Sequence, residues 1–95
     1  MNTLIQPPTH WMLVVEPDGV VRSTVASVVR ELELAQVHQA ASVPLGAQVL
    51  AESAVDAMVL SLADTDAALE LLTRLRAGEF VSRADIPVVV LASAC

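Results

Sequence analysis

Short apolar segments alternate with longer amphipathic ones along this chain, and this alternation constrains the fold more than any other feature. Three segments, 11–15, 56–62 and 88–91, have the length and the Val- and Leu-rich composition of buried strands, and a weaker one spans 36–41. Strands that are apolar on both faces and alternate with amphipathic helices indicate a parallel sheet covered on both sides. We therefore predict an α/β domain with the order βαβαβαβ.

Three helices are expected between these strands. The first begins near Val20, and its apolar residues recur at helical spacing to form one stripe: Val21, Val25, Val28, Val29 and Leu32. The second begins at Pro44, a residue suited to a first helical turn. The third opens with the polar cluster 64–66 and ends at Gly78. Its expected inner side carries three leucines: Leu69, Leu72 and Leu75.

Length and charge limit the domain count and the partners. The 95 residues suffice for one domain, predicted as 11–95, after a flexible N-terminal tail of residues 1–10. Eleven acidic residues against five basic ones give a net charge of −6, which argues against nucleic acid or an anionic membrane as a partner. The single cysteine, Cys95, and the lack of a secretion signal or membrane span predict a cytoplasmic protein.

Four segments resemble the receiver domain of bacterial two-component response regulators. They follow the family's order with about its spacing: VVEPDGVVR (14–22), DAMVLSL (56–62), LELLTRLR (69–76) and IPVVVLAS (86–93). The resemblance implies a flavodoxin-like (CheY-like) three-layer sandwich with parallel strands in the order 2-1-3-4. It also implies that the chain is C-terminally truncated, because a fifth strand and the last helices of a receiver are absent from the sequence.

The resemblance does not extend to the family's chemistry, which transfers a phosphoryl group from a histidine kinase to an aspartate. The family's pair of metal-binding acids falls on Glu16 and Pro17, its phospho-acceptor falls on Ser61, and its hydroxyl switch falls on Ala92. The family's lysine has no counterpart, since the chain contains no lysine. A proline cannot ligate a metal through its side chain, and a serine hydroxyl cannot form an acyl phosphate. We therefore expect a degenerate pseudo-receiver, with no catalytic residue and no cofactor.

The acidic residues beside these positions leave two alternatives open. Glu16 and Asp18 can together bind Mg²⁺ weakly, although the simpler interpretation is that Asp18 caps the first helix and Glu16 is solvated. Asp64 can act as a displaced phospho-acceptor, although the simpler interpretation is that it begins the third helix. Ser61 is expected to be a structural serine at the end of its strand, since no histidine is near it in sequence to activate it.

The last strand is expected to lie at an open edge of the sheet. It is apolar and carries no charged residue, so it lacks the usual protection against edge-to-edge pairing. We predict that the chain forms a homo-oligomer through this strand, by two-fold pairing or by exchange of elements between copies. The predicted interface residues are Val88, Val89, Val90 and Leu91.

Together these features predict a non-catalytic, receiver-like signalling module. It would act through phosphorylation-independent contacts with a kinase, regulator or effector protein of a bacterial two-component pathway. The alternatives are a phosphorylation-competent receiver that uses a displaced carboxylate such as Asp64, a small enzyme or ligand binder at the strand ends, and a fragment of a longer response regulator whose C-terminal part carries the output.

Overall fold

The computed structural model describes residues 9–92, so Cys95 and most of the predicted tail lie outside the described residues. Its strands form one parallel sheet in the order β2-β1-β3-β4, which confirms the predicted topology. The strands are β1 (Trp11–Val15), β2 (Gln36–Ala40), β3 (Ala57–Ser61) and β4 (Val88–Leu91). The helices are α1 (Gly19–Glu31), α2 (Val43–Glu52) and α3 (Thr65–Arg76).

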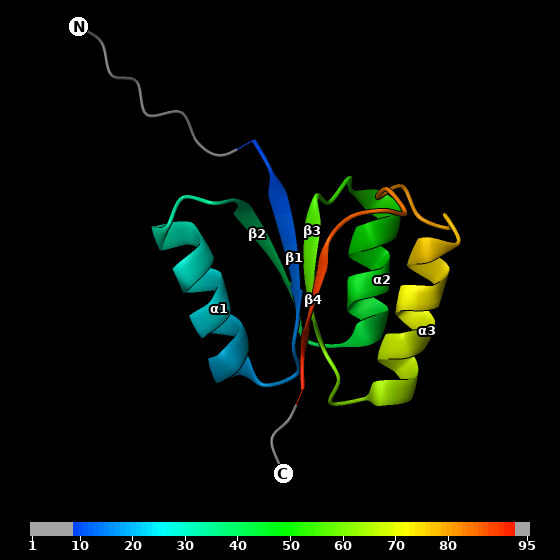
Figure 1. Ribbon diagram of the computed structural model, residues 1–95. Coiled ribbons are helices and arrows are strands. Elements are labelled where there is room, and N and C mark those ends of the chain that lie inside the picture. Colours follow the sequence, from blue (N-terminus) through cyan, green and yellow to red (C-terminus); the bar gives the residue numbers. More distant parts are fainter. Residues whose placement is uncertain (1–8, 93–95) are drawn as a thin grey trace, which may run out of the picture.

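The helices cover the two faces of the sheet unequally. Helix α1 lies on one face, while α2 and α3 lie together on the other (Figure 1). The main core lies beneath α2 and α3, where buried aliphatic side chains of the sheet and both helices meet: Leu13, Val15, Leu50, Met58, Leu60, Leu71 and Leu75. None of the helices in residues 9–92 is long and apolar enough to cross a membrane.

Each helix begins at a polar residue whose side chain accepts hydrogen bonds from the first turn. These N-cap residues are Asp18 for α1, Ser42 for α2 and Asp64 for α3. Helix α3 is followed by Gly78, whose φ of 79° is readily adopted by glycine and costly for other residues. The predicted helix starts and the predicted stop at Gly78 are confirmed.

The inner side predicted for α3 is partly wrong. Leu69 is exposed, Leu72 is half-buried, and the residues buried against the sheet are Ala68, Leu71 and Leu75. The small Ala68 lies where the helix approaches the sheet, and its neighbour Leu69, about 100° further round the helix, points to solvent.

The apolar stripe predicted for α1 is also only partly covered. Val29 and the unpredicted Ala26 are buried, whereas Val21, Val28 and Leu32 are exposed. The cause is the position of the helix: α1 packs over β1 and β2 and leaves the same face of β3 and β4 without a helix in the described part of the chain.

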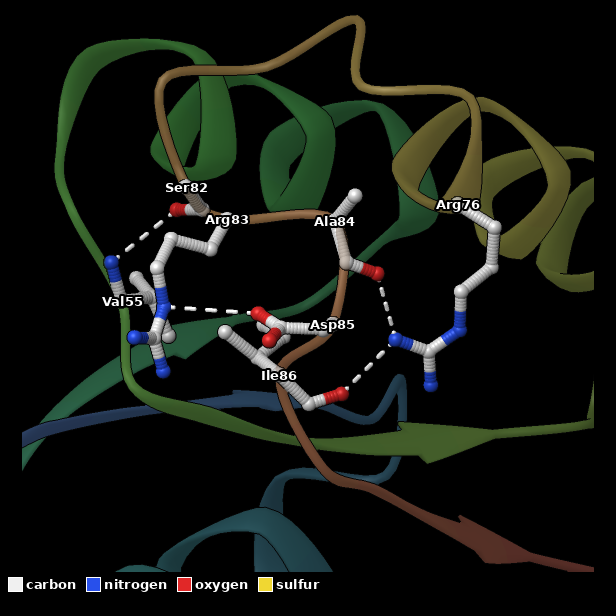
Figure 2. A network of polar contacts seen from close by, with 7 residues as sticks. All are labelled: Val55, Arg76, Ser82, Arg83, Ala84, Asp85 and Ile86. Carbon is white, nitrogen blue, oxygen red and sulfur yellow. Dashed lines mark hydrogen bonds and ion pairs between the residues drawn. The ribbon is translucent and has the colours of Figure 1, made fainter.

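The loop between α3 and β4 is fixed by a network of polar contacts, drawn in Figure 2. The buried hydroxyl of Ser82 accepts a hydrogen bond from the N–H of Val55 at 3.0 Å. From α3, Arg76 Nη1 donates to the carbonyl oxygens of Ala84 at 2.6 Å and Ile86 at 2.9 Å. These contacts fix the point at which the chain enters β4.

Candidate functional site

The carboxyl ends of β1, β3 and β4 meet at one edge of the sheet, where open α/β sheets bind ligands. A pocket of about 380 Å³ lies there, which we call the carboxyl-end pocket. Its lining includes five of the positions that the sequence analysis singled out: Glu16, Pro17, Asp18, Ser61 and Ala92. The structure thus brings together residues that lie up to 76 positions apart in the sequence, from 16 to 92.

Glu16 is held inside this pocket, so the expectation that it is solvated is wrong. It is 8 % exposed, and its Oε2 accepts a hydrogen bond from the backbone N–H of Asp18 at 3.1 Å. Arg22 Nη1 donates to the carbonyl oxygen of Glu16 at 2.8 Å, a contact that sequence reasoning missed. The only signal for it is an arginine on the first turn of α1, six residues after Glu16.

Asp18 caps α1, as the simpler interpretation predicted. Its Oδ1 accepts hydrogen bonds from the N–H groups of Val20 at 2.9 Å and Val21 at 3.2 Å. The carboxylate of Glu16 is therefore hydrogen-bonded to the backbone of the loop after β1, and that of Asp18 to the first turn of α1. Among residues 9–92 there is no group of three side chains able to hold a metal ion. Mg²⁺ prefers several convergent oxygen ligands.

The hydroxyl of Ser61 is hydrogen-bonded to the backbone of the loop that follows β3. The residue is buried, and its Oγ accepts a hydrogen bond from the N–H of Ala63 at 3.1 Å. The two histidines of the chain are elsewhere: His10 precedes β1, and His38 on β2 stacks on Trp11 with ring centroids 4.3 Å apart. Neither histidine is therefore placed to activate Ser61 as a nucleophile.

A second pocket, of about 230 Å³, adjoins the first through Pro17 and Ser61 and also reaches Asp64. Its other lining residues are mostly apolar and come from β1 and the start of α2, which sequence reasoning did not anticipate. Asp64 is exposed, and its Oδ1 accepts a hydrogen bond from the N–H of Ala67 at 3.2 Å. Asp64 thus begins α3, as the simpler interpretation predicted.

The predicted interface residues lie on β4, at the side of the sheet opposite β2. In the described part of the chain β4 pairs only with β3. Val89 and Val90 are 59 % and 45 % exposed, while Val88 and Leu91 are half-buried. Among residues 9–92, β4 is therefore an edge strand with exposed apolar side chains, and the interface stays a prediction.

Comparison with known proteins identifies the fold. No protein-family model and no curated protein matches the sequence. A solved structure of the MaeR response regulator bound to beryllium trifluoride is similar to this chain, with a TM-score of 0.76 and 17 % sequence identity. The similarity covers 92 % of this chain and 70 % of that one. The fold is therefore receiver-like, as the sequence resemblance implied.

Proposed function

We propose that this chain is a receiver-like signalling module that acts through protein–protein contacts without being phosphorylated. The observation that carries the proposal is the composition of the carboxyl-end pocket. It presents the pyrrolidine ring of Pro17, the hydroxyl of Ser61 and the methyl group of Ala92 at the ends of three adjacent strands. None of these groups can accept a phosphoryl group as an acyl phosphate or bind a metal ion as a carboxylate does.

The carboxylates that remain do not supply the missing chemistry. A phosphoryl group adds negative charge to the pocket, and a divalent cation normally offsets that charge. Here Glu16 and Asp18 each accept backbone hydrogen bonds, and the chain has no lysine to provide a positive charge. The proposal therefore includes neither an enzymatic activity nor a cofactor.

The partner in this proposal is another protein of a bacterial signalling pathway, such as a kinase, a regulator or an effector. The net charge of −6 argues against nucleic acid, whose binding requires lysine and arginine. The receiver-like fold supports a role in the cytoplasm, where such modules meet their partners. In a module of this kind, the exposed surfaces bind the partner protein, and the carboxyl-end pocket binds no ligand.

Beryllium trifluoride provides the direct test, because it binds carboxylates as a phosphoryl analogue and because the MaeR structure contains it. The amide signals of the ¹⁵N-labelled chain are followed by NMR as beryllium trifluoride and Mg²⁺ are added, with MaeR as the positive control. We expect no saturable shift change at Glu16, Asp18 or Ser61. A saturable change confined to the carboxyl-end pocket would contradict the proposal.

A second candidate function is supported by the position of Asp64, which shares a pocket with Pro17 and Ser61. In this alternative Asp64 accepts the phosphoryl group in place of the usual aspartate. The matched variant is Asp64→Asn, because asparagine still caps a helix but cannot form an acyl phosphate. Incorporation of phosphate from acetyl phosphate that disappears in Asp64→Asn would favour this alternative over the first proposal.

A further inference from the structure

The second pocket lies where the strand order of the sheet reverses. The chain passes from β1 to β2 on one side and later adds β3 on the other side of β1, and the pocket spans the ends of β1 and β3 through Val15 and Ser61. Open α/β sheets bind ligands at such a switch point. Strands β1 and β3 each pair with a neighbour on both sides, so the pocket involves no edge of the sheet.

The walls of the second pocket are mostly apolar. They come from β1, the loops that follow β1 and β2, and the start of α2: Val15, Pro17, Ala41, Val43 and Pro44. The volume of about 230 Å³ is below the roughly 300–1,000 Å³ that is usual for pockets of drug-sized ligands. A ligand that suits these walls therefore has a small, compact apolar body.

Ser61 and Asp64 bring hydrogen-bond acceptors to this pocket. Ser61 is 5 % exposed, and its Oγ accepts one hydrogen bond, from the N–H of Ala63, although a hydroxyl oxygen has two lone pairs. Asp64 is exposed, and only its Oδ1 is used in capping α3, although a carboxylate has two accepting oxygens. Both side chains can therefore accept a further hydrogen bond from a ligand.

The charge at this end of the sheet is negative. Among the described residues that line the second pocket, Asp64 alone is ionisable. The loop after β1 and the first two turns of the three helices carry four more acids and one base: Glu16, Asp18, Asp66, Glu70 and Arg22. Further along α3, Arg74 forms an ion pair of 3.3 Å with Glu79, so that pair adds no net charge. The pocket therefore attracts cations and repels anions.

The starts of α2 and α3 do not reverse this preference. A helix N-terminus binds anions through N–H groups that lack a partner within the helix. Here the Oγ of Ser42 accepts a hydrogen bond from Leu45 N at 3.3 Å, and Oδ1 of Asp64 accepts one from Ala67 N at 3.2 Å. Each cap occupies an N–H group that an anion would need, and Asp64 adds a negative charge at the same place.

We propose that the second pocket binds a small organic cation, namely a primary amine on a compact apolar body. The ammonium group donates hydrogen bonds to Asp64 and Ser61, and the apolar body packs against Val15, Val43 and Pro44. This inference goes beyond the proposed function, since it assigns a ligand to a pocket that contacts with a partner protein do not use.

Cyclohexylamine is a suitable probe, because its amine, like that of lysine, is protonated at pH 7. The amide signals of the ¹⁵N-labelled full chain are followed by NMR at constant pH and ionic strength. We expect saturable shifts at Ala41, Ser42, Val43 and Asp64 with a Kd of about 1 mM, a value reasonable for so small a ligand. No saturable change up to about 20 mM would overturn the inference.

Ligands of the same ring size separate charge from shape. We expect cyclohexanol, which lacks the charge, to bind about threefold or more weakly than the amine, and cyclohexanecarboxylate to cause no saturable change. Binding of the alcohol as tight as that of the amine would overturn the inference, since the carboxylate of Asp64 would then not select the ligand. Saturable binding of the carboxylate would overturn it too.

A pair of matched variants tests Asp64 itself. Asp64→Asn and Asp66→Asn each remove one negative charge from the start of α3, but Asp66 does not line the second pocket. Asparagine still caps a helix, so both variants should fold, as circular dichroism verifies. We expect Asp64→Asn to raise the Kd of cyclohexylamine about threefold or more and Asp66→Asn to change it less than about twofold. Equal weakening by the two variants would overturn the inference.

The outcomes for this inference and for the proposed function are separable. The beryllium trifluoride test depends on Glu16 and Asp18, which line the carboxyl-end pocket and not the second pocket. A protein that binds neither probe would overturn the amine site and leave the phosphorylation-independent module standing. A protein that binds both, each at its own pocket, would do the reverse.

Discussion

The hydroxyl of Ser82 accepts a hydrogen bond from the backbone N–H of Val55 at 3.0 Å, and so joins positions 27 residues apart. The same Oγ donates to the carbonyl oxygen of Ser53 at 2.6 Å, and Ser82 itself is 1 % exposed. One buried side chain thus satisfies both a donor and an acceptor of the segment that leads into β3. It also ties that segment to the loop that leads into β4, the strand at the open edge.

Replacing Ser82 with alanine should therefore destabilise the whole domain. The Ser82→Ala variant leaves the N–H of Val55 and the carbonyl of Ser53 without this partner in a buried place, which costs about 1–3 kcal/mol for such a group. Urea unfolding followed by circular dichroism measures the change in the free energy of unfolding. Ser23→Ala, on the exposed surface of α1, is the control and should change it by less than about 0.5 kcal/mol. An equal effect of the two variants would contradict this role of Ser82.

The close approach of α2 to β1 predicts that Gly46 does not tolerate alanine. A Cβ added at Gly46 would lie 2.7 Å from Cγ2 of the buried Val15, so either the helix or Val15 would have to shift. The gain in helix propensity, about 0.5–1 kcal/mol, is outweighed by overpacking that costs about 1–3 kcal/mol. We expect Gly46→Ala to lower the free energy of unfolding and Gly19→Ala, whose nearest contact would be 3.6 Å, to leave it nearly unchanged. A stabilised Gly46→Ala variant would show that α2 shifts freely on the sheet.

Much of the fold was predictable because its determinants are local. Apolar runs such as 88–91 mark the strands, Asp18 and Asp64 cap the helices that follow them, and Gly78 ends α3 at a positive φ. The strand order followed from the resemblance to receivers. The parallel strand order in turn placed Glu16, Ser61 and Ala92 at one edge of the sheet, because the carboxyl ends of parallel strands meet there.

The features that sequence reasoning missed depend on tertiary packing. The helical spacing of the apolar residues does not predict that Val28 and Leu32 are exposed, because their exposure depends on which strands α1 covers. The burial of Glu16 depends on how the following loop folds back to bring the N–H of Asp18 to its carboxylate. The role of Ser82 depends on two loops that are far apart in the sequence. No local pattern encodes such contacts.

The position of Arg76 predicts that it orders the loop before β4. Its guanidinium donates to two carbonyl oxygens of that loop, at 2.6 and 2.9 Å, from the exposed surface of α3. We expect Arg76→Ala to lower the free energy of unfolding by about 1 kcal/mol, since solvent screens the charge, and to speed amide hydrogen exchange in 79–87. Arg83→Ala removes only an exposed ion pair with Asp85 and should change stability by less than about 0.5 kcal/mol. If Arg83→Ala speeds exchange as much as Arg76→Ala does, the two carbonyl contacts do not order the loop.

Adding carboxylates to the carboxyl-end pocket should create a metal-binding site. In the double variant Pro17→Asp/Ser61→Asp, two new carboxylates join Glu16 at one edge of the sheet, giving the convergent oxygen ligands that Mg²⁺ requires. We expect Mg²⁺ to raise the Tm of this variant, because a ligand that binds only the folded state stabilises it, and to leave the wild-type Tm unchanged. The single variant Pro17→Asp is the control that shows the effect of one added carboxylate at the exposed position. Measurements with Ca²⁺ and Na⁺ at equal ionic strength distinguish metal coordination from charge screening. If Mg²⁺ raises the Tm of the wild-type protein as much as that of the double variant, Glu16 and Asp18 already bind the ion. That outcome would contradict the prediction that their carboxylates serve only to accept backbone hydrogen bonds.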